Sequence, residues 1–244
     1  MKVGIIVFSP TGNSRKIAEI INKNCSADIL DITYENLRNN LINKQLTSDL
    51  LFFIFPVHAQ GVPFIAELFI KNANINCKGV SIICTFGDIN AGKAVFRAQK
   101  VFKDKGIKAF SMAEIPSVHS YKNNSVNSVD LTDFINKTIL NLNSNKYLQT
   151  KKSIVIQYPQ KLFSHLAISI KTDKNKCTEC KKCISLCPAG AIKEDSNIDN
   201  KKCIRCVACV KYCSVTARRY KITNKITNFY LNLFRKPHQP RYYL

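Results

Sequence analysis

The sequence predicts an α/β fold, in which a doubly wound, five-stranded parallel sheet precedes a small α+β domain. Short apolar runs alternate with helical patterns over residues 1–142, as in sheets whose parallel strands are joined by crossover helices. Eight of the 11 cysteines follow residue 150. The formal charge of +21 divides into +6 over residues 1–150 (17 basic, 11 acidic) and +15 over residues 151–244 (20 basic, 5 acidic). Two parts with such different compositions indicate two domains.

Five apolar runs are the predicted strands of the sheet. They lie at residues 3–8, 27–32, 50–56, 79–86 and 109–115. The clearest of them are almost continuously apolar, which is typical of parallel strands covered on both faces. Apolar residues at helical spacing predict helices at residues 14–24, 65–71, 91–105 and 130–142.

The expected domain boundaries follow from these patterns. The sheet domain takes residues 1–146, a packed connection takes 147–172, the cysteine-rich domain takes 173–216, and a basic tail takes 217–244. The tail has no acidic residue and has apolar side chains at helical spacing, namely Ile222, Ile226, Phe229, Tyr230 and Leu233. We expect a helix that docks on the body of the protein. A helix in peripheral contact with a membrane surface is the alternative.

Composition excludes several classes of protein. With 45% hydrophobic and 22% charged residues, the chain is not disordered. The longest uninterrupted apolar run, residues 50–57, is far shorter than the roughly 18 residues of a membrane span. The first eight residues lack a cleavage pattern and are interpreted as a strand, not a signal peptide. We therefore expect a cytoplasmic protein, in which thiols stay reduced and dense cysteines indicate metal.

Two cysteine runs of matching spacing follow one another. The first is Cys177-x2-Cys180-x2-Cys183-x3-Cys187-Pro188, and the second is Cys203-x2-Cys206-x2-Cys209-x3-Cys213. This is the spacing of bacterial ferredoxins, in which three cysteines of one run bind one [4Fe–4S] cluster and the fourth binds the other. Cluster 1 is accordingly assigned to Cys177, Cys180, Cys183 and Cys213. Cluster 2 is assigned to Cys203, Cys206, Cys209 and Cys187.

Zinc and disulfides are the alternatives for these cysteines. A zinc site closes at four ligands and needs no third evenly spaced cysteine, and disulfides are disfavoured in a reducing compartment. Ser214 stands where ferredoxins usually repeat the proline after the fourth cysteine. Cys25, Cys77 and Cys84 lie outside the runs and are expected to be ordinary core or surface residues.

A polar loop follows the first predicted strand. Ser9-Pro10-Thr11-Gly12-Asn13-Ser14 combines hydroxyls, an amide and a glycine at the start of a helix, where backbone N–H groups bind phosphate. A plain helix cap is the alternative, although a cap needs only one such side chain. The loop resembles the flavodoxin motif Ser/Thr-x-Thr-Gly-Asn-Thr, with Ser14 in place of the last threonine. In flavodoxins it binds the FMN phosphate, which implies phosphate contacts from Ser9, Thr11, Gly12, Asn13 and Ser14.

The resemblance to flavodoxin covers residues 1–142 and implies two loops around the flavin ring. The first contains Pro56, Val57, His58, Ala59 and Gly61, and the second contains Thr85, Phe86, Gly87 and Asp88. The backbone from Ala59 to Gly61 is the candidate partner of flavin N5–H, and Phe86 is the candidate aromatic neighbour. His58 stands where related proteins that fuse a flavodoxin to a ferredoxin domain often have an aromatic residue, and an ordinary loop histidine is the alternative. His119 lies in a segment similar to one of those fusions, without an assigned role.

A second glycine-containing segment is a weaker candidate for nucleotide binding. Residues 87–94 nearly match the nucleotide P-loop, but Ala94 occupies the position of the hydroxyl that would bind Mg²⁺. The sequence contains no Gly-x-Gly-x-x-Gly motif. We therefore expect neither an ATP site nor a Rossmann dinucleotide domain.

Taken whole, the chain resembles the fused flavodoxin–ferredoxin proteins of anaerobic bacteria and archaea. The resemblance implies FMN, two [4Fe–4S] clusters and electron transfer to or from a redox partner. A reductase of a small acceptor, such as a quinone or nitro compound, is the alternative. The basic charge also suggests nucleic acid, but its concentration beside the clusters favours a partner protein with an acidic docking face.

Overall fold

A six-stranded sheet forms the centre of the larger domain. The computed structural model describes residues 1–87, 90–120, 129–149, 160–223, 225, 228–229 and 238–244. The strands are β1 (Val3–Val7), β2 (Asp28–Asp31), β3 (Gln45–Pro56), β4 (Asn74–Phe86), β5 (Ala109–Pro116) and β8 (Arg241–Tyr243). Their order is β2-β1-β3-β4-β5-β8, with the first five parallel and β8 antiparallel to β5. The order 2-1-3-4-5 is that of a flavodoxin-like, doubly wound sheet, so the predicted fold class is confirmed.

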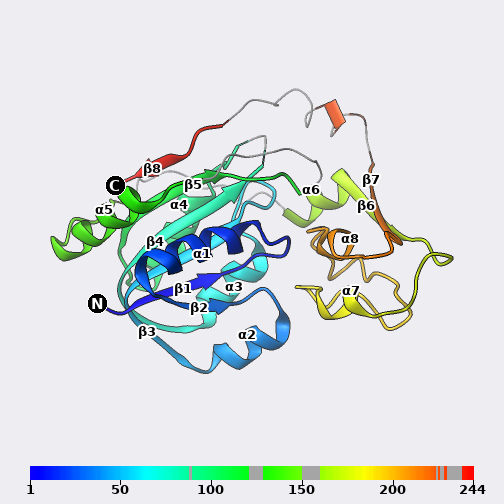
Figure 1. The fold of residues 1–244 in the computed structure, drawn as a ribbon, viewed down its shortest axis with the longest axis horizontal. Coiled ribbons are helices and arrows are strands. Elements are labelled where there is room, and N and C mark those ends of the chain that lie inside the picture. Colours follow the sequence, from blue (N-terminus) through cyan, green and yellow to red (C-terminus); the bar gives the residue numbers. More distant parts are fainter. Residues whose placement is uncertain (88–89, 121–128, 150–159, 224, 226–227, 230–237) are drawn as a thin grey trace.

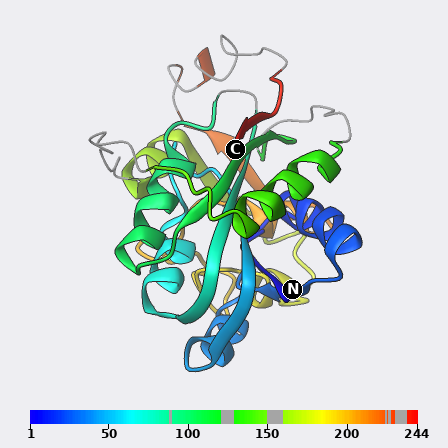
Figure 2. The ribbon, with the colours of Figure 1, turned by 90° about the vertical axis from the view of Figure 1, so that its left-hand side faces the viewer.

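Helices cover both faces of this sheet. They are α1 (Asn13–Cys25), α2 (Glu35–Ile42), α3 (Phe64–Asn72), α4 (Ala94–Asp104) and α5 (Thr132–Asn143). Alternate residues of the strands point to opposite faces, and each face buries its own apolar cluster. α3 and α4 contribute to one cluster, and α1 and α5 contribute to the other (Figure 2). Sequence patterns predicted all of these helices except α2, which has no fully buried residue and packs on the core only through residues at its C-terminal end, Leu41 and Ile42.

The cysteine-rich domain lies at the carboxyl edge of the sheet (Figure 1). Its elements are α6 (Gln160–Ala167), β6 (Ile168–Thr172), α7 (Lys182–Ser185), α8 (Ala208–Lys211) and β7 (Arg218–Ile222). β6 and β7 pair antiparallel. Both strands lie outside the expected range of 173–216, because the hairpin that closes this domain takes one strand from the connection and one from the tail.

The tail differs from the expected single helix. Ile222 lies in β7, opposite Ile168, and Arg241 begins the edge strand β8. Phe229 is helical, as the pattern predicts, but it is exposed and not docked on the body of the protein. Ile226, Tyr230 and Leu233 lie outside the described residues. Both ends of the tail form strands, β7 and β8, although the sequence has helical spacing. The strands are favoured because they satisfy backbone N–H and C=O groups at the edges of two sheets. None of the described helices reaches the length and hydropathy that a membrane crossing would need.

Candidate functional site

The two cysteine runs have the same backbone path. The first cysteines, Cys177 and Cys203, are 203 − 177 = 26 residues apart. Each donates its backbone N–H to the carbonyl of an aspartate four residues earlier, at 3.1 Å for Cys177 and 2.9 Å for Cys203. Left-handed residues recur at the same offset, with φ between 51° and 58°: Glu179, Lys181 and Gly190, then Arg205, Val207 and Thr216. The runs are therefore a structural repeat as well as a repeat in sequence.

This left-handed backbone is unfavourable for most of the residues that adopt it. Each non-glycine residue costs roughly 1–2 kcal/mol, and a branched residue such as Val207 is a clear outlier. Turns of this kind direct successive N–H groups inward. Ala191 N–H donates to Cys187 Sγ at 3.3 Å, and Arg205 N–H donates to Cys203 Sγ at 3.5 Å. Such hydrogen bonds stabilise the thiolate ligands of an iron–sulfur cluster and adjust its potential.

The four cysteines assigned to cluster 2 line one small cavity. Its other walls are mainly apolar and include Ile170, Ile192 and Ile198. Burial raises the pKa of the Cys209 thiol to about 12 and also raises the pKa of Cys206, and the neighbouring cysteines add to both shifts. Four thiols that line one small cavity can become thiolates together only if a cationic centre compensates their charge. Cysteine donors in this setting fit a [4Fe–4S] cluster.

The cysteines assigned to cluster 1 lie closer to solvent. Cys180 is exposed, and Cys177, Cys183 and Cys213 are half-buried. Cys183 is close enough to Cys209 to influence its pKa, and α7 contacts α8, so the two runs meet. In the described part of the chain, no three His, Cys, Asp or Glu side chains form a site for a single metal ion.

The polar loop between β1 and α1 is largely buried, and some of its backbone donors lack a protein acceptor. Gly12 has φ 83° and ends the loop. Ser9 Oγ accepts the N–H of Arg15 at 2.9 Å, and Ser14 Oγ is 2.8 Å from Thr85 Oγ1, where both side chains are buried. Among the described residues, the backbone N–H groups of Asn13 and Ser14 have no protein acceptor. Free amides at a helix start are suited to an anion such as phosphate.

Three further loops, which follow β3, β4 and β5, meet at the same edge of the sheet. A Cβ atom on Gly92 would lie 2.6 Å from the Gln60 carbonyl oxygen, and one on Gly87 would lie 2.5 Å from the His119 ring. The structure thus brings the loop after β3 and the loop after β4 close together. Phe86 is buried and packs edge-on against His238, with ring centroids 5.4 Å apart. Asp88 lies outside the described residues.

The loop after β3 is a tight turn with strained backbone. His58 and Gly61 exchange backbone hydrogen bonds of 3.0 and 3.1 Å. The two residues between them, Ala59 and Gln60, both have positive φ, at 44° and 62°. Turns of this type normally use glycine or asparagine. Pro56 and Val57, which precede the turn, are half-buried.

His58 has an unusual environment within this turn. Its Nε2 is shielded from solvent and has no hydrogen-bond partner among protein atoms of the described chain. Burial lowers the pKa of His58, which favours the neutral imidazole. His58 also lines an interdomain groove, so its position is at the junction of the two domains and not on an ordinary surface loop.

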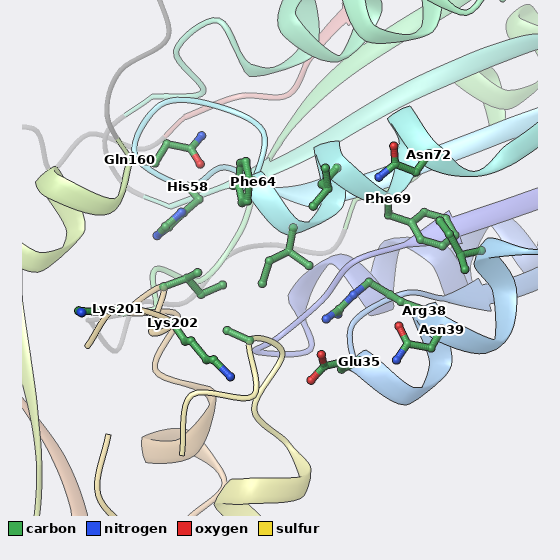
Figure 3. A pocket seen from close by; sticks show the side chains of 15 residues that line it. Glu35, Arg38, Asn39, His58, Phe64, Phe69, Asn72, Gln160, Lys201 and Lys202 are labelled. Carbon is green, nitrogen blue, oxygen red and sulfur yellow. The ribbon is translucent and has the colours of Figure 1, made fainter. Parts of the chain in front are cut away.

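That groove has a volume of about 920 Å³ and separates α2 and α3 from the cysteine-rich domain. Figure 3 shows Phe64 and Phe69 of α3 on one wall, Arg38 of α2 on another, and Lys202 extending from the cysteine-rich domain. Phe64 is 59% exposed. Sequence reasoning missed the groove because its walls come from segments that are more than 80 residues apart in the chain.

Polar contacts hold the two domains together around this edge. Arg38 Nη2 donates to the Pro188 carbonyl at 2.7 Å, and Lys211 Nζ donates to the Thr11 carbonyl at 2.6 Å. His165 Nε2 lies 2.8 Å from the carbonyl oxygen of Cys203. The cysteine runs are thus packed directly against the loop that the sequence assigns to phosphate.

Comparison with known proteins supports the iron–sulfur part of this site. The family model of the 4Fe-4S binding domain matches residues 170–193, which contain the first cysteine run. No curated protein matches the chain significantly. This match indicates iron–sulfur electron transfer as the general chemistry of the cysteine-rich domain.

Two solved structures share a low similarity with the chain. Trp repressor binding protein from Bacillus subtilis is 15% identical over 48% of this chain and 85% of that protein, with a TM-score of 0.36. Rubredoxin oxygen:oxidoreductase from the anaerobe Desulfovibrio gigas is 11% identical over 57% of this chain and 34% of that protein, with a TM-score of 0.39. The strand order 2-1-3-4-5 identifies the fold independently of these similarities.

Proposed function

We propose that the protein is an electron carrier of the fused flavodoxin–ferredoxin type, with FMN in the sheet domain and two [4Fe–4S] clusters in the cysteine-rich domain. One observation is central: the repeated cysteine runs are docked on the polar loop at the carboxyl edge of the sheet. Clusters exchange single electrons, whereas a flavin can hold one or two. We place this protein in the cytoplasm, where its cysteines would remain reduced.

The residues of the sheet domain have distinct roles in this proposal. The free amides of Asn13 and Ser14, with the Thr11 hydroxyl, bind the phosphate. The Ser14–Thr85 hydrogen bond fixes the phosphate loop to the end of β4. The strained turn at Ala59 and Gln60 presents backbone groups to the flavin ring, since strain of this kind is often retained at functional sites.

The partner in this proposal is a redox protein with an acidic face, not a nucleic acid. Lys201 and Lys202 directly precede the cluster-2 ligand Cys203 and border the groove. Exposed Phe64 and Leu68 of α3 lie on the opposite wall. Apolar anchors beside basic residues suit an acidic surface, with the charges increasing the association rate. The same groove is also large enough for a small organic acceptor, and this observation favours the reductase alternative.

Iron, sulfide and flavin analysis of anaerobically reconstituted protein tests the proposal. About eight iron atoms and one FMN per chain are expected, with absorbance changes of both cofactors during stepwise reduction. Electron exchange with a small acidic ferredoxin should slow as salt is added. Rapid turnover of quinones or nitro compounds, with no exchange with the ferredoxin, would favour the reductase instead. A protein that binds iron but no flavin would refute both functions.

A further inference from the structure

The cysteine-rich domain places a lysine on the polar loop of the sheet domain. Lys211 is the last residue of α8, and its Nζ donates to the Thr11 carbonyl at 2.6 Å. The next residue, Tyr212, covers Gly12 so closely that a Cβ atom there would lie 3.1 Å from the tyrosine hydroxyl. Figure 1 shows α8 facing the loop between β1 and α1. Two consecutive residues of one domain thus contact the loop of the other.

Lys211 has no negative partner in the part of the chain that the structure describes. None of the salt bridges there involves it. Its contact with Thr11 is partly buried, and one carbonyl uses only one of its three N–H donors. Among the described residues, Lys211 therefore brings a positive charge to the polar loop with no carboxylate to balance it.

The polar loop contains no cation of its own. Residues 9–14 include neither lysine nor arginine. Arg15, which follows, is engaged with Asp31 and Glu19. The free amides of Asn13 and Ser14 provide hydrogen bonds but no full charge. The side chain of Lys16 of α1 is exposed and makes no hydrogen bond to residues 9–14 among those of the described residues, whereas Lys211 already touches the loop at Thr11. A dianionic ligand in the loop would therefore find a cation of the other domain already in contact with it.

We propose that Lys211 is the cationic ligand of the flavin phosphate, supplied to the flavin site by the cysteine-rich domain. This inference rests on the proposed function. It makes Lys211 a determinant of specificity, because its charge stabilises FMN and contributes nothing to riboflavin, which lacks the phosphate.

The position of Lys211 connects flavin binding to the clusters. α8 lies between Cys206 and Cys213, which are assigned to different clusters, and Lys211 is two residues from both Cys209 and Cys213. Ligation of iron therefore fixes the backbone that holds Lys211 over the loop. Coupling between binding sites is reciprocal, so bound FMN in turn stabilises the clusters against loss of iron.

The first test compares FMN and riboflavin affinities of cluster-loaded protein by quenching of flavin fluorescence. Lys211→Met should weaken FMN binding by about tenfold or more, as expected for a lost charged hydrogen bond, and leave riboflavin binding unchanged. Lys211→Arg should retain most of the affinity. Lys193→Met is the matched control, because Lys193 is exposed on the same domain and should affect neither ligand. Iron content of each variant shows that the domain has folded.

The outcomes separate the two proposals. Wild-type protein that prefers FMN over riboflavin, together with an unchanged preference in Lys211→Met, would overturn the role of Lys211 and leave the proposed function intact. Wild-type protein that binds neither flavin would refute the proposed function, and this inference with it.

The second test measures how fast a chelator removes iron. FMN should slow the loss from wild-type protein, and it should do so much less in Lys211→Met, while riboflavin should have little effect on either. Equal protection by FMN and riboflavin, or equal protection of both proteins by FMN, would contradict the coupling. Because this readout follows iron, it remains informative if flavin affinity is too high to measure directly.

Discussion

The two domains of this protein are stabilised in different ways. The sheet domain buries large side chains on both faces of the sheet, and its fully buried residues include six phenylalanines. In the described residues from Ile168 to Ile222, the buried apolar side chains are few and mostly small: Ile168, Ala191, Ile192, Val207, Ala208, Cys209 and Ala217. A domain with so little core normally needs a metal or a disulfide to remain folded.

Backbone strain shows the same contrast. Ten described non-glycine residues have positive φ, and six of them lie between residues 173 and 216. Strained conformations persist only where other interactions determine them. The sheet domain can supply such interactions through its core. The cysteine-rich domain has to obtain them from ligation at its cysteines, so the comparison predicts that one domain depends on its cofactor and the other does not.

Removal of iron should have the largest effect. Chelation is expected to unfold the cysteine-rich domain and to leave the sheet domain folded, because metal binding there is coupled to folding. Hydrogen exchange should then show loss of protection in β6 and β7 and retained protection in β3 and β4. Uniform loss of protection in both domains would show that the sheet domain does not fold independently.

Single cysteine variants make the same comparison more specific. Cys206→Ala should lose one cluster, about four of the eight iron atoms. Cys77→Ala, at a half-buried thiol of β4, should retain all of them. If Cys206→Ala kept its full iron content and spectrum, the ligand assignment would be wrong.

Disrupting a buried ion pair should have an intermediate effect on stability, confined to the sheet domain. Glu67 of α3 is 5% exposed and accepts two hydrogen bonds from Arg97 of α4, at 2.7 and 2.8 Å. Burial alone would raise the pKa of Glu67, but the hydrogen bonds from Arg97 and Lys71 outweigh burial and lower it. Glu67→Gln should therefore cost about 3–5 kcal/mol of unfolding free energy at neutral pH.

The sign of the pH dependence follows from this shift. A carboxylate whose pKa is lower in the folded state stabilises the protein above its ordinary pKa of about 4.3. That contribution is lost as the pH falls below this value, so wild type and Glu67→Gln should converge in acid. Urea unfolding at neutral and acidic pH measures the difference in unfolding free energy between the two proteins. Asp133→Asn, at an exposed carboxylate, is the control. A difference that grew in acid would contradict the assigned direction.

The sequence predicts the parts of this molecule whose signal is local. The apolar run at 50–56 is the centre of β3, and the cysteine spacing predicts the repeat around Cys177 and Cys203. Contacts between distant segments leave no such signal. β8 has three residues and pairs with a strand more than 120 positions earlier, and Lys211 reaches Thr11 across 200 positions.

The predicted starts of two strands were wrong for a related reason. β3 and β4 begin at Gln45 and Asn74, well before their apolar runs, because these polar residues pair with each other where β1 does not extend. A polar strand end has no pattern that distinguishes it from a loop. The groove beside His58 was also unpredictable, since it exists only after the two domains are packed together.

Release of backbone strain should have the smallest effect, and it compares the two domains at the same kind of residue. Ala59→Gly removes a left-handed alanine from the turn after β3 and should stabilise the sheet domain by up to about 1 kcal/mol, measured as a higher urea midpoint.

Lys181→Gly likewise replaces a left-handed residue by glycine, at an exposed position in the first cysteine run. If ligation maintains the strain there, this variant should lose iron to a chelator more slowly than wild type, with no change in the urea midpoint of the sheet domain. An unchanged rate of iron loss would mean that the left-handed backbone is set by the protein alone, and the contrast between the domains would then be one of core size only.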